Sequence, residues 1–464
     1  MLSIFDRSPR LCDGISRRAL LTAGGIGALG ISAGLPGVSR ALERSKTSGP
    51  AKRCIVLFLL GGPPQHSTWD PKPLAPAEVR GEFGAIPTNV PGVYISELMP
   101  LTAARMDKFA VLRAVVTGDN AHSSSGYYVM TGTPHIPKNR ENANPGPPND
   151  WPTLGAGVQH LAAGSRLLPP AVRLPHHIFN TDGSVWPGQD SGWLGHADDP
   201  WLFHCEPASP AFDLPQFRLQ ADVTLSRLSK RRRLLEQLES QLRRAERSAS
   251  QVRYSDEQRQ AFDLLTTPKA RSACDLTQEP KPVRERYGQS QFGQSVLLAR
   301  RLIEADVNFV QVNWFRGPEE PKDAPCWDSH SNESKRLKTV LVPPFDQALS
   351  ALLDELEQRN LLEETLVVCL AEFGRTPKFN ARAGRDHWGH VFSLALAGGG
   401  IRGGQIHGES DREAAYPLEK IVHPEDIAAT IFHCLGYPPE TEIHNAAGRP
   451  FPISRGRVLR ELLS

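Results

Sequence analysis

Apolar runs alternate with amphipathic stretches along most of this sequence. The apolar runs, several of them β-branched, predict buried strands over residues 55–60, 109–116, 309–314, 365–370 and 391–397. Helical periodicity and capping residues predict helices over residues 122–131, 296–305, 342–357 and 424–435. Strands alternating with helices predict an α/β fold, a three-layer α/β/α sandwich around a mainly parallel sheet.

The middle of the chain departs from this alternation. Residues 134–215 are dense in Pro, Asn, Asp, Trp and Gly, which predicts an irregular segment, either a functional loop or a structural cap over the sheet. Residues 222–249 predict a charged amphipathic helix whose charges form a solvated face. We therefore expect one large domain over residues 42–464, with an irregular or helical insertion at about residues 134–290.

The first 41 residues read as a targeting segment. Arg17-Arg18 precedes a leucine pair, a weakly apolar glycine-rich run follows, and Ser39 and Ala41 offer a cleavage site, so the segment resembles a twin-arginine export signal. The alternatives are a retained membrane anchor and a disordered tail. We expect export to the periplasm or the outside of the cell, and no membrane span in the mature chain, because no later run reaches ~20 apolar residues.

The charge balance limits the classes of partner that the mature chain is expected to bind. The full sequence has 53 basic and 51 acidic residues, and removal of residues 1–41 leaves 48 against 49. A nucleic-acid-binding protein concentrates positive charge, so this balance argues against a nucleic-acid partner. The widely spaced cysteines form no CxxC pair, which argues against a zinc ribbon or a thioredoxin-like site.

Carboxylates and imidazoles follow or precede several predicted strands. Asp328 and His330 come after the strand at 309–314, Glu372 follows the strand at 365–370, and Asp386 and His387 precede the strand at 391–397. Sites in open α/β sheets lie at the carboxyl ends of the strands, so these side chains are candidates for one site. They are ligands for zinc, manganese or another divalent cation. The alternative for each is a loop residue that hydrogen-bonds to backbone groups.

Four ordered segments, residues 61–73, 327–330, 372–377 and 384–387, resemble the signature stretches of the domain-of-unknown-function 1501 (DUF1501) proteins. These are exported bacterial proteins grouped with the alkaline phosphatase and sulfatase superfamily. The resemblance covers essentially the whole mature chain and implies an alkaline-phosphatase-like sandwich. It implies no known reaction, because the family is uncharacterised.

The superfamily comparison suggests roles for further residues. Its nucleophile lies at a helix start, and here that segment begins His122-Ser123, which makes Ser123 the candidate nucleophile and His122 a metal ligand or base. Counting back ten residues from Gly132 puts His122 at the nucleophile position, and a one-residue shift puts Ser123 there. Ser123 could equally be an N-cap. Arg375 could clamp an anionic oxygen or pair with an acid. The first strand lacks the superfamily's aspartate, and Phe373 stands where a histidine ligand is expected, which implies one retained metal position and one eroded position.

These observations predict an exported, metal-dependent hydrolase of phosphate or sulfate esters, acting on a small anionic ester. The divalent ion would be zinc, manganese or calcium. The alternative is a catalytically degenerate member of the fold that binds an anionic ligand or a partner protein. A third interpretation is a glycan-binding surface at Trp186, Trp193 and Trp201.

Overall fold

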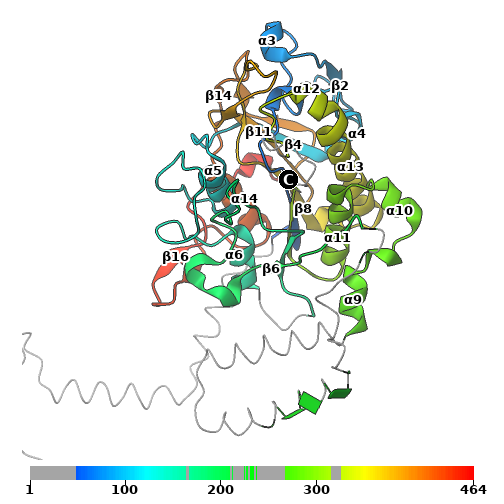
Figure 1. Ribbon diagram of the computed structural model, residues 1–464, viewed down its shortest axis with the longest axis vertical. Coiled ribbons are helices and arrows are strands. Elements are labelled where there is room, and N and C mark those ends of the chain that lie inside the picture. The colour runs from blue at the N-terminus through cyan, green and yellow to red at the C-terminus, as the bar shows by residue number, and fades with distance from the viewer. Residues whose placement is uncertain are drawn as a thin grey trace, which may run out of the picture. The chain divides into compact units, whose positions relative to one another are not determined.

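An eight-stranded sheet forms the middle layer of the computed structural model, which describes residues 49–162, 167–209, 267–314 and 326–464 and isolated residues between 212 and 237 (Figure 1). Its strands are β1 (Arg53–Phe58), β4 (Phe109–Val115), β5 (Ala171–Leu174), β6 (Trp201–Leu202), β7 (Phe309–Asn313), β8 (Thr365–Leu370), β11 (Phe392–Ala397) and β12 (Gln405–His407). Their order in the sheet is β12-β4-β11-β8-β1-β7-β5-β6.

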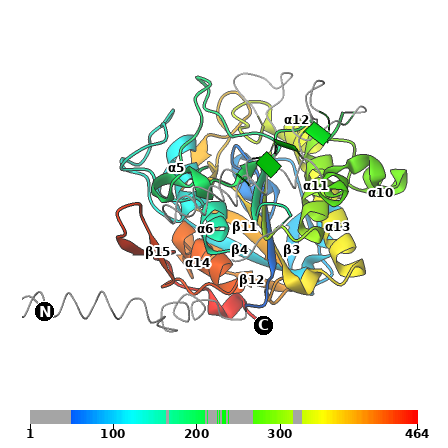
Figure 2. The ribbon, with the colours of Figure 1, turned by 90° about the horizontal axis from the view of Figure 1, so that it is seen from below.

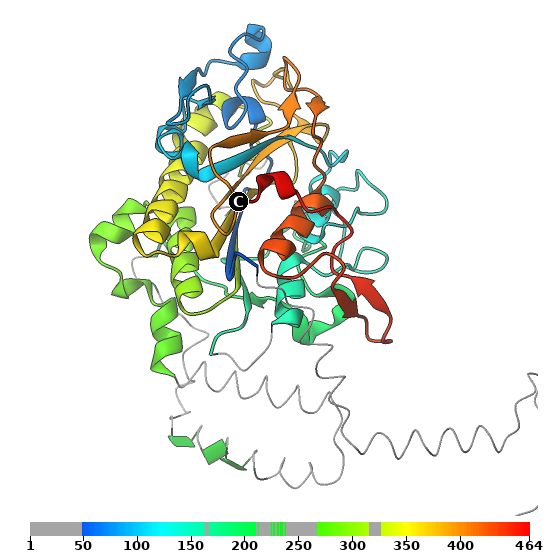
Figure 3. The same ribbon diagram turned by 180° about the vertical axis from the view of Figure 1, so that it is seen from behind.

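Helices cover both faces of this sheet, as the two perpendicular views show (Figures 1 and 2). On one face α11 (Gln291–Glu304) packs against α13 (Val342–Gln358). On the other face α14 (Pro424–Cys434) packs against α5 (His122–Thr131), near α6 (Leu154–Leu161). The view from behind shows the same separation of α11 and α13 from α14 (Figure 3). The predicted three-layer α/β/α sandwich is therefore confirmed.

Shorter elements occupy the edges and loops. They are α3 (Ala77–Arg80), β2 (Ala85–Pro87), β3 (Tyr94–Ser96), α4 (Pro100–Ala103), α9 (Pro268–Cys274), α10 (Lys281–Arg286), α12 (Glu333–Arg336), β9 (Gly374–Arg375), β10 (His387–Trp388), β13 (Glu409–Ser410), β14 (Pro417–Glu419), β15 (Glu442–His444) and β16 (Pro450–Pro452). Among the described residues, no helix is both long enough and apolar enough to cross a membrane.

Strand direction explains why distant segments meet at one edge of the sheet. β1 pairs in parallel with β7 and β8, whereas β11 runs antiparallel to β8 and β4. Because β11 is reversed, the residues that precede it lie at the same edge as the residues that follow β1, β7 and β8. The segments around Asp328, Glu372 and His387 therefore converge.

The register at that edge brings the loops into direct contact. Phe58 at the end of β1 pairs with Asn313 and Leu370, and the N–H of Trp327 donates to the carbonyl of Leu60 at 3.0 Å. The next residue, Gly61, has a φ of 111°, and a Cβ there would lie 2.2 Å from the backbone nitrogen of Asp328. Only glycine combines a positive φ with so close an approach of another backbone. Gly61 therefore lets the Asp328 loop pack directly against the end of β1.

The structure corrects the prediction for residues 134–215. This stretch contains α6 and the two strands β5 and β6, which extend the central sheet beyond β7. The strands were missed because they have four and two residues, so their polar, proline-rich flanks dominate the pattern. The predicted signal over residues 1–41 and most of the predicted helix over residues 222–249 lie outside the described residues. Residues Ser48–Ser464 form one compact unit.

Candidate metal centre

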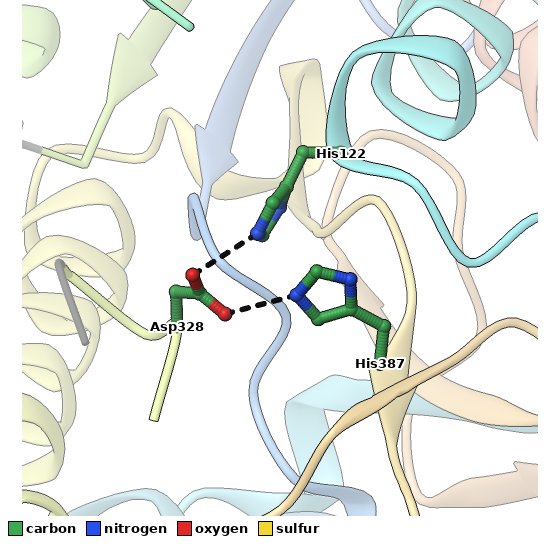
Figure 4. A group of neighbouring side chains, drawn as sticks. All are labelled: His122, Asp328 and His387. Carbon is green, nitrogen blue, oxygen red and sulfur yellow. Dashed lines mark hydrogen bonds and ion pairs between the residues drawn. The ribbon is translucent and has the colours of Figure 1, made fainter. Parts of the chain in front are cut away.

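Asp328 lies between two histidines that are 265 positions apart in the sequence (Figure 4). His122 is the first residue of α5, and His387 opens the short strand β10. The distance from Asp328 Oδ2 to His122 Nε2 is 3.2 Å, and that from Asp328 Oδ1 to His387 Nε2 is 3.1 Å. One ligand atom from each of the three residues lies within 4.8 Å of the other two.

His330 adds a third imidazole to this group. Its Nε2 lies 3.0 Å from Asp328 Oδ1 and 2.8 Å from His387 Nε2. The predicted approach of Asp328, His330 and His387 to one another is therefore realised in the structure. We call these three residues together with His122 the metal centre.

The outer nitrogen of each histidine has an oxygen partner. His387 Nδ1 lies 2.7 Å from the carbonyl oxygen of Asn120, which can only accept, so this nitrogen carries the hydrogen. His122 Nδ1 lies 2.8 Å from Glu372 Oε1, and His330 Nδ1 lies 2.8 Å from Asp386 Oδ1. Such partners fix the tautomer and leave the three Nε2 atoms to converge on Asp328, which is the usual preparation of histidine ligands.

The charges in the centre depend strongly on one another. Burial opposes ionisation of Asp328, but His122 and Arg375 outweigh it and hold the pKa of this carboxyl well below its usual range. Burial likewise disfavours protonation of His122, yet Asp328 and Glu372 raise its pKa to about 10. Burial and the charge of His122 lower the pKa of His387 to about 3, which keeps this imidazole neutral.

The polar atoms of the centre fit a divalent cation. Among the described residues, His122 Nε2 has no partner in hydrogen-bond geometry although it faces Asp328 at 3.2 Å, and Glu372 Oε2 is also buried without a hydrogen bond. Deprotonated imidazole nitrogens and a carboxylate are ligands for zinc and similar ions, so binding of an ion would release the proton that Asp328 and Glu372 favour on His122. His122, Asp328, His330 and His387 would hold such an ion.

Glu372 and Asp386, predicted as metal ligands, contact histidines of the centre. Glu372 is fully buried, and its Oε1 also accepts from the N–H of Gly61 at 2.8 Å. The side chain of Asp386 is 55% exposed and accepts from Asn380 Nδ2 as well. In this arrangement both carboxylates orient imidazoles, and their role as ligands remains a prediction.

Arg375 directs its guanidinium to protein oxygens. Nε donates to the carbonyl of Gly62 at 3.0 Å, and the terminal nitrogens donate to the carbonyl oxygens of Arg385 and Gly61 and to Asp328 Oδ1, the last at 2.6 Å. The side chain is fully buried. Of the two roles open for Arg375, pairing with an acid is the one seen, and the clamp on a substrate oxygen stays a prediction.

Ser123 lies beside the centre in sequence, but its hydroxyl contacts another loop. Its Oγ donates to the carbonyl of Arg140 at 2.9 Å and accepts from the N–H of Ala143 at 3.0 Å. The N-cap of α5 is Ala121, so Ser123 is not the N-cap either. The hydroxyl anchors the segment that follows α5. Its hydrogen bonds to the described residues do not include one to the metal centre, so its role as nucleophile stays a prediction.

Sequence reasoning missed several contacts around the centre. Glu141 Oε1 accepts from the N–H of His122 at 2.8 Å at the start of α5, and the ring of Phe373 stacks on His387 with centroids 4.5 Å apart. Trp186 packs against His122 at 5.9 Å and is buried, so it cannot present a face to a glycan. A backbone carbonyl such as that of Asn120 has no signature in sequence.

The fold and the centre define an α/β protein with a largely buried imidazole–carboxylate cluster at the carboxyl edge of its sheet. The chain belongs to the DUF1501 family of proteins of unknown function, whose family model matches residues 51–463. The predicted family is therefore confirmed. No curated protein matches the sequence.

Solved structures similar to this chain include sulfatases and phosphonate monoester hydrolases. A putative sulfatase from Bacteroides thetaiotaomicron is 13% identical, with 89% of this chain and 74% of that chain covered and a TM-score of 0.40. The phosphonate monoester hydrolase of Agrobacterium radiobacter is 12% identical, with 89% and 77% covered and a TM-score of 0.41.

Proposed function

We propose that this protein is an exported hydrolase of phosphate or sulfate esters that depends on a divalent metal ion. The observation that carries the proposal is the convergence of three imidazole Nε2 atoms on Asp328, each histidine being oriented by an oxygen acceptor on its other nitrogen. A bound divalent ion supplies Lewis acidity toward the anionic oxygens of an ester. Zinc, manganese and calcium are the ions to test.

The residues of the chain have separable tasks in this proposal. Asp328, His122, His330 and His387 hold the ion, whereas Glu372, Asp386 and the Asn120 carbonyl orient the histidines. Arg375 fixes Asp328 against the end of β1 by its hydrogen bonds to Gly61 and Asp328. Phe373 and Trp186 cover the rings of His387 and His122 and limit the access of water.

A metal titration followed by turnover assays tests this function. The purified protein should bind Zn2+ or Mn2+ and then hydrolyse an aryl phosphate or an aryl sulfate. His387→Ala should lose turnover and the ion held by the metal centre, whereas His444→Ala, which changes an exposed histidine, should keep both. Absence of turnover with every one of the three ions would sink the hydrolase proposal.

The second candidate function is binding of an anionic ligand without turnover. It is favoured by the internal hydrogen bonds of Ser123 and Arg375, which occupy the two side chains expected to attack and clamp a substrate. In that case the metal-loaded protein binds inorganic phosphate or sulfate, and His387→Ala abolishes this binding, but no ester is cleaved.

Export remains part of the proposal and rests on the twin-arginine-like segment. Replacement of Arg17 and Arg18 by lysine should leave the full-length protein inside the cell. Fractionation of expressing cells gives the answer, and export of the doubly substituted protein contradicts this route.

A further inference from the structure

Two histidines lie together at the carboxyl edge of the sheet, in the loops that follow β5 and β6. Neither loop contributes a residue to the metal centre. β5 and β6 are parallel neighbours in which Arg173 pairs with Leu202. His176 follows the end of β5 by two residues, and His204 follows the end of β6 by two residues. Both loops leave the same edge of the paired strands, and the two imidazole rings lie with their centroids 4.6 Å apart.

One nitrogen of His176 is directed at His204. His176 Nε2 lies 3.3 Å from Glu206 Oε1, and a carboxylate accepts hydrogen bonds, so Nε2 carries the hydrogen in the neutral ring. His176 Nδ1 then presents its lone pair to His204 Nδ1, which lies 3.0 Å away. A carboxylate on one nitrogen and an inward-facing second nitrogen is the same arrangement that His122 and His330 show in the metal centre.

The backbone beneath this pair is fixed, and space adjoins it. Asn313 Nδ2 donates to the carbonyl of His176 at 2.8 Å, and Gln311 Nε2 donates to Asn313 Oδ1 at 2.8 Å. His176 and Glu206 line a cavity of about 280 Å3 whose wall also includes Trp314. The cavity leaves room for water or a ligand next to His176.

We propose that His176 and His204 form a second metal site, which binds Zn2+ or a similar divalent transition-metal ion through their Nδ1 atoms. Glu206 orients His176, and groups in the cavity complete the coordination. Imidazole nitrogens suit zinc, copper and nickel, whereas magnesium and calcium prefer oxygen ligands. Zinc–nitrogen bonds of about 2.0–2.1 Å place two ligands of a tetrahedral ion ~3.3 Å apart, close to the separation seen here.

Calorimetric titration of the full chain with Zn2+ tests this site. The wild-type protein should bind two equivalents of Zn2+. The His176→Ala variant and the His204→Ala variant should each bind one equivalent. The double variant that carries His204→Ala and His387→Ala should bind none. Glu206→Gln should weaken one of the two binding events by about tenfold, as loss of an orienting carboxylate does elsewhere. His444→Ala, at an exposed histidine, should keep two equivalents.

The outcomes separate this proposal from the metal centre. Loss of one equivalent in His204→Ala but none in His387→Ala supports the second site and contradicts the first. A single equivalent that disappears in His387→Ala and survives in His204→Ala overturns the second site. His204 is exposed, so its substitution should not disturb folding, and circular dichroism together with a His204→Gln variant checks this. The visible spectrum of the Co2+-loaded protein reports the loss of an imidazole ligand independently.

Discussion

At the scale of single residues, the contact of Asp386 with His330 suits a residue that positions an imidazole. Its Oδ1 accepts from His330 Nδ1 at 2.8 Å, while its side chain remains 55% exposed. Asp386→Asn should therefore lower zinc affinity by about tenfold through misorientation of His330, with little loss of stability. Zinc titration and the Co2+ spectrum measure the effect, and Glu440→Gln at another exposed acid is the control. An unchanged affinity and spectrum would show that His330 needs no such partner.

Ser123 gives a second prediction at this scale. Because its hydroxyl bridges the Arg140 carbonyl and the Ala143 N–H, Ser123→Ala should cost about 1–2 kcal/mol of the free energy of unfolding. Zinc affinity and any ester turnover should change little. Urea unfolding and the turnover assay test the two parts. A folded Ser123→Ala protein that binds zinc but has lost all turnover would instead identify Ser123 as the nucleophile.

At the scale of elements, the length of each apolar run decided whether a strand could be predicted from the sequence. The strands β1 and β8 have six residues each and are buried, so their pattern stands out, whereas β5 and β6 are short and were missed. The sequence predicted Asp328, His330 and Glu372 at one edge because they follow parallel strands. His387 precedes β11 and reaches that edge only because β11 runs antiparallel to β8, a direction that the apolar pattern did not reveal. The partners of Ser123 and Arg375 are mostly backbone carbonyls, which leave no pattern in the sequence.

The start of α5 depends on close packing between the helix and Trp186. A Cβ at Gly126 would lie 2.4 Å from the Trp186 ring, and the same ring contacts His122. Gly126→Ala should therefore destabilise the protein by about 1–3 kcal/mol through overpacking, although alanine favours helices by about 1 kcal/mol. Zinc affinity should fall as well, because a displaced Trp186 no longer supports His122.

A double-mutant cycle isolates this contact. Trp186→Phe removes the ring atoms nearest to Gly126, so Gly126→Ala should cost less in that background. Urea unfolding of the four proteins gives the coupling free energy. Equal costs in both backgrounds would mean that Trp186 does not limit the space at Gly126.

At the scale of the whole molecule, buried His66 links stability to pH. Burial, together with the charge of Arg385, lowers the pKa of His66 to about 3, against 6.5 for an unperturbed histidine. Between about pH 3 and pH 6.5, His66 is protonated in the unfolded chain but neutral in the folded protein. The free energy of unfolding therefore decreases as the pH falls below about 6.5. From pH 7 to pH 5 this one group should remove about 2 kcal/mol. His66→Gln should show a smaller loss over that range in urea unfolding of the zinc-free protein, and equal losses would contradict the assignment.

Metal binding should stabilise the whole unit of residues Ser48–Ser464. An ion that binds only the folded chain adds about 2.7 kcal/mol at a concentration of 100 times its Kd. A unit of this size has an unfolding entropy of about 0.9 kcal/mol/K, so each filled site should raise Tm by ~3 °C. A chelator should reverse the rise, and His387→Ala should lose the part that belongs to the metal centre, while His444→Ala keeps all of it. Since this shift requires binding but no chemistry, a rise in Tm without ester turnover selects the ligand-binding candidate over the hydrolase. If zinc leaves Tm unchanged, the metal has no part in either candidate function.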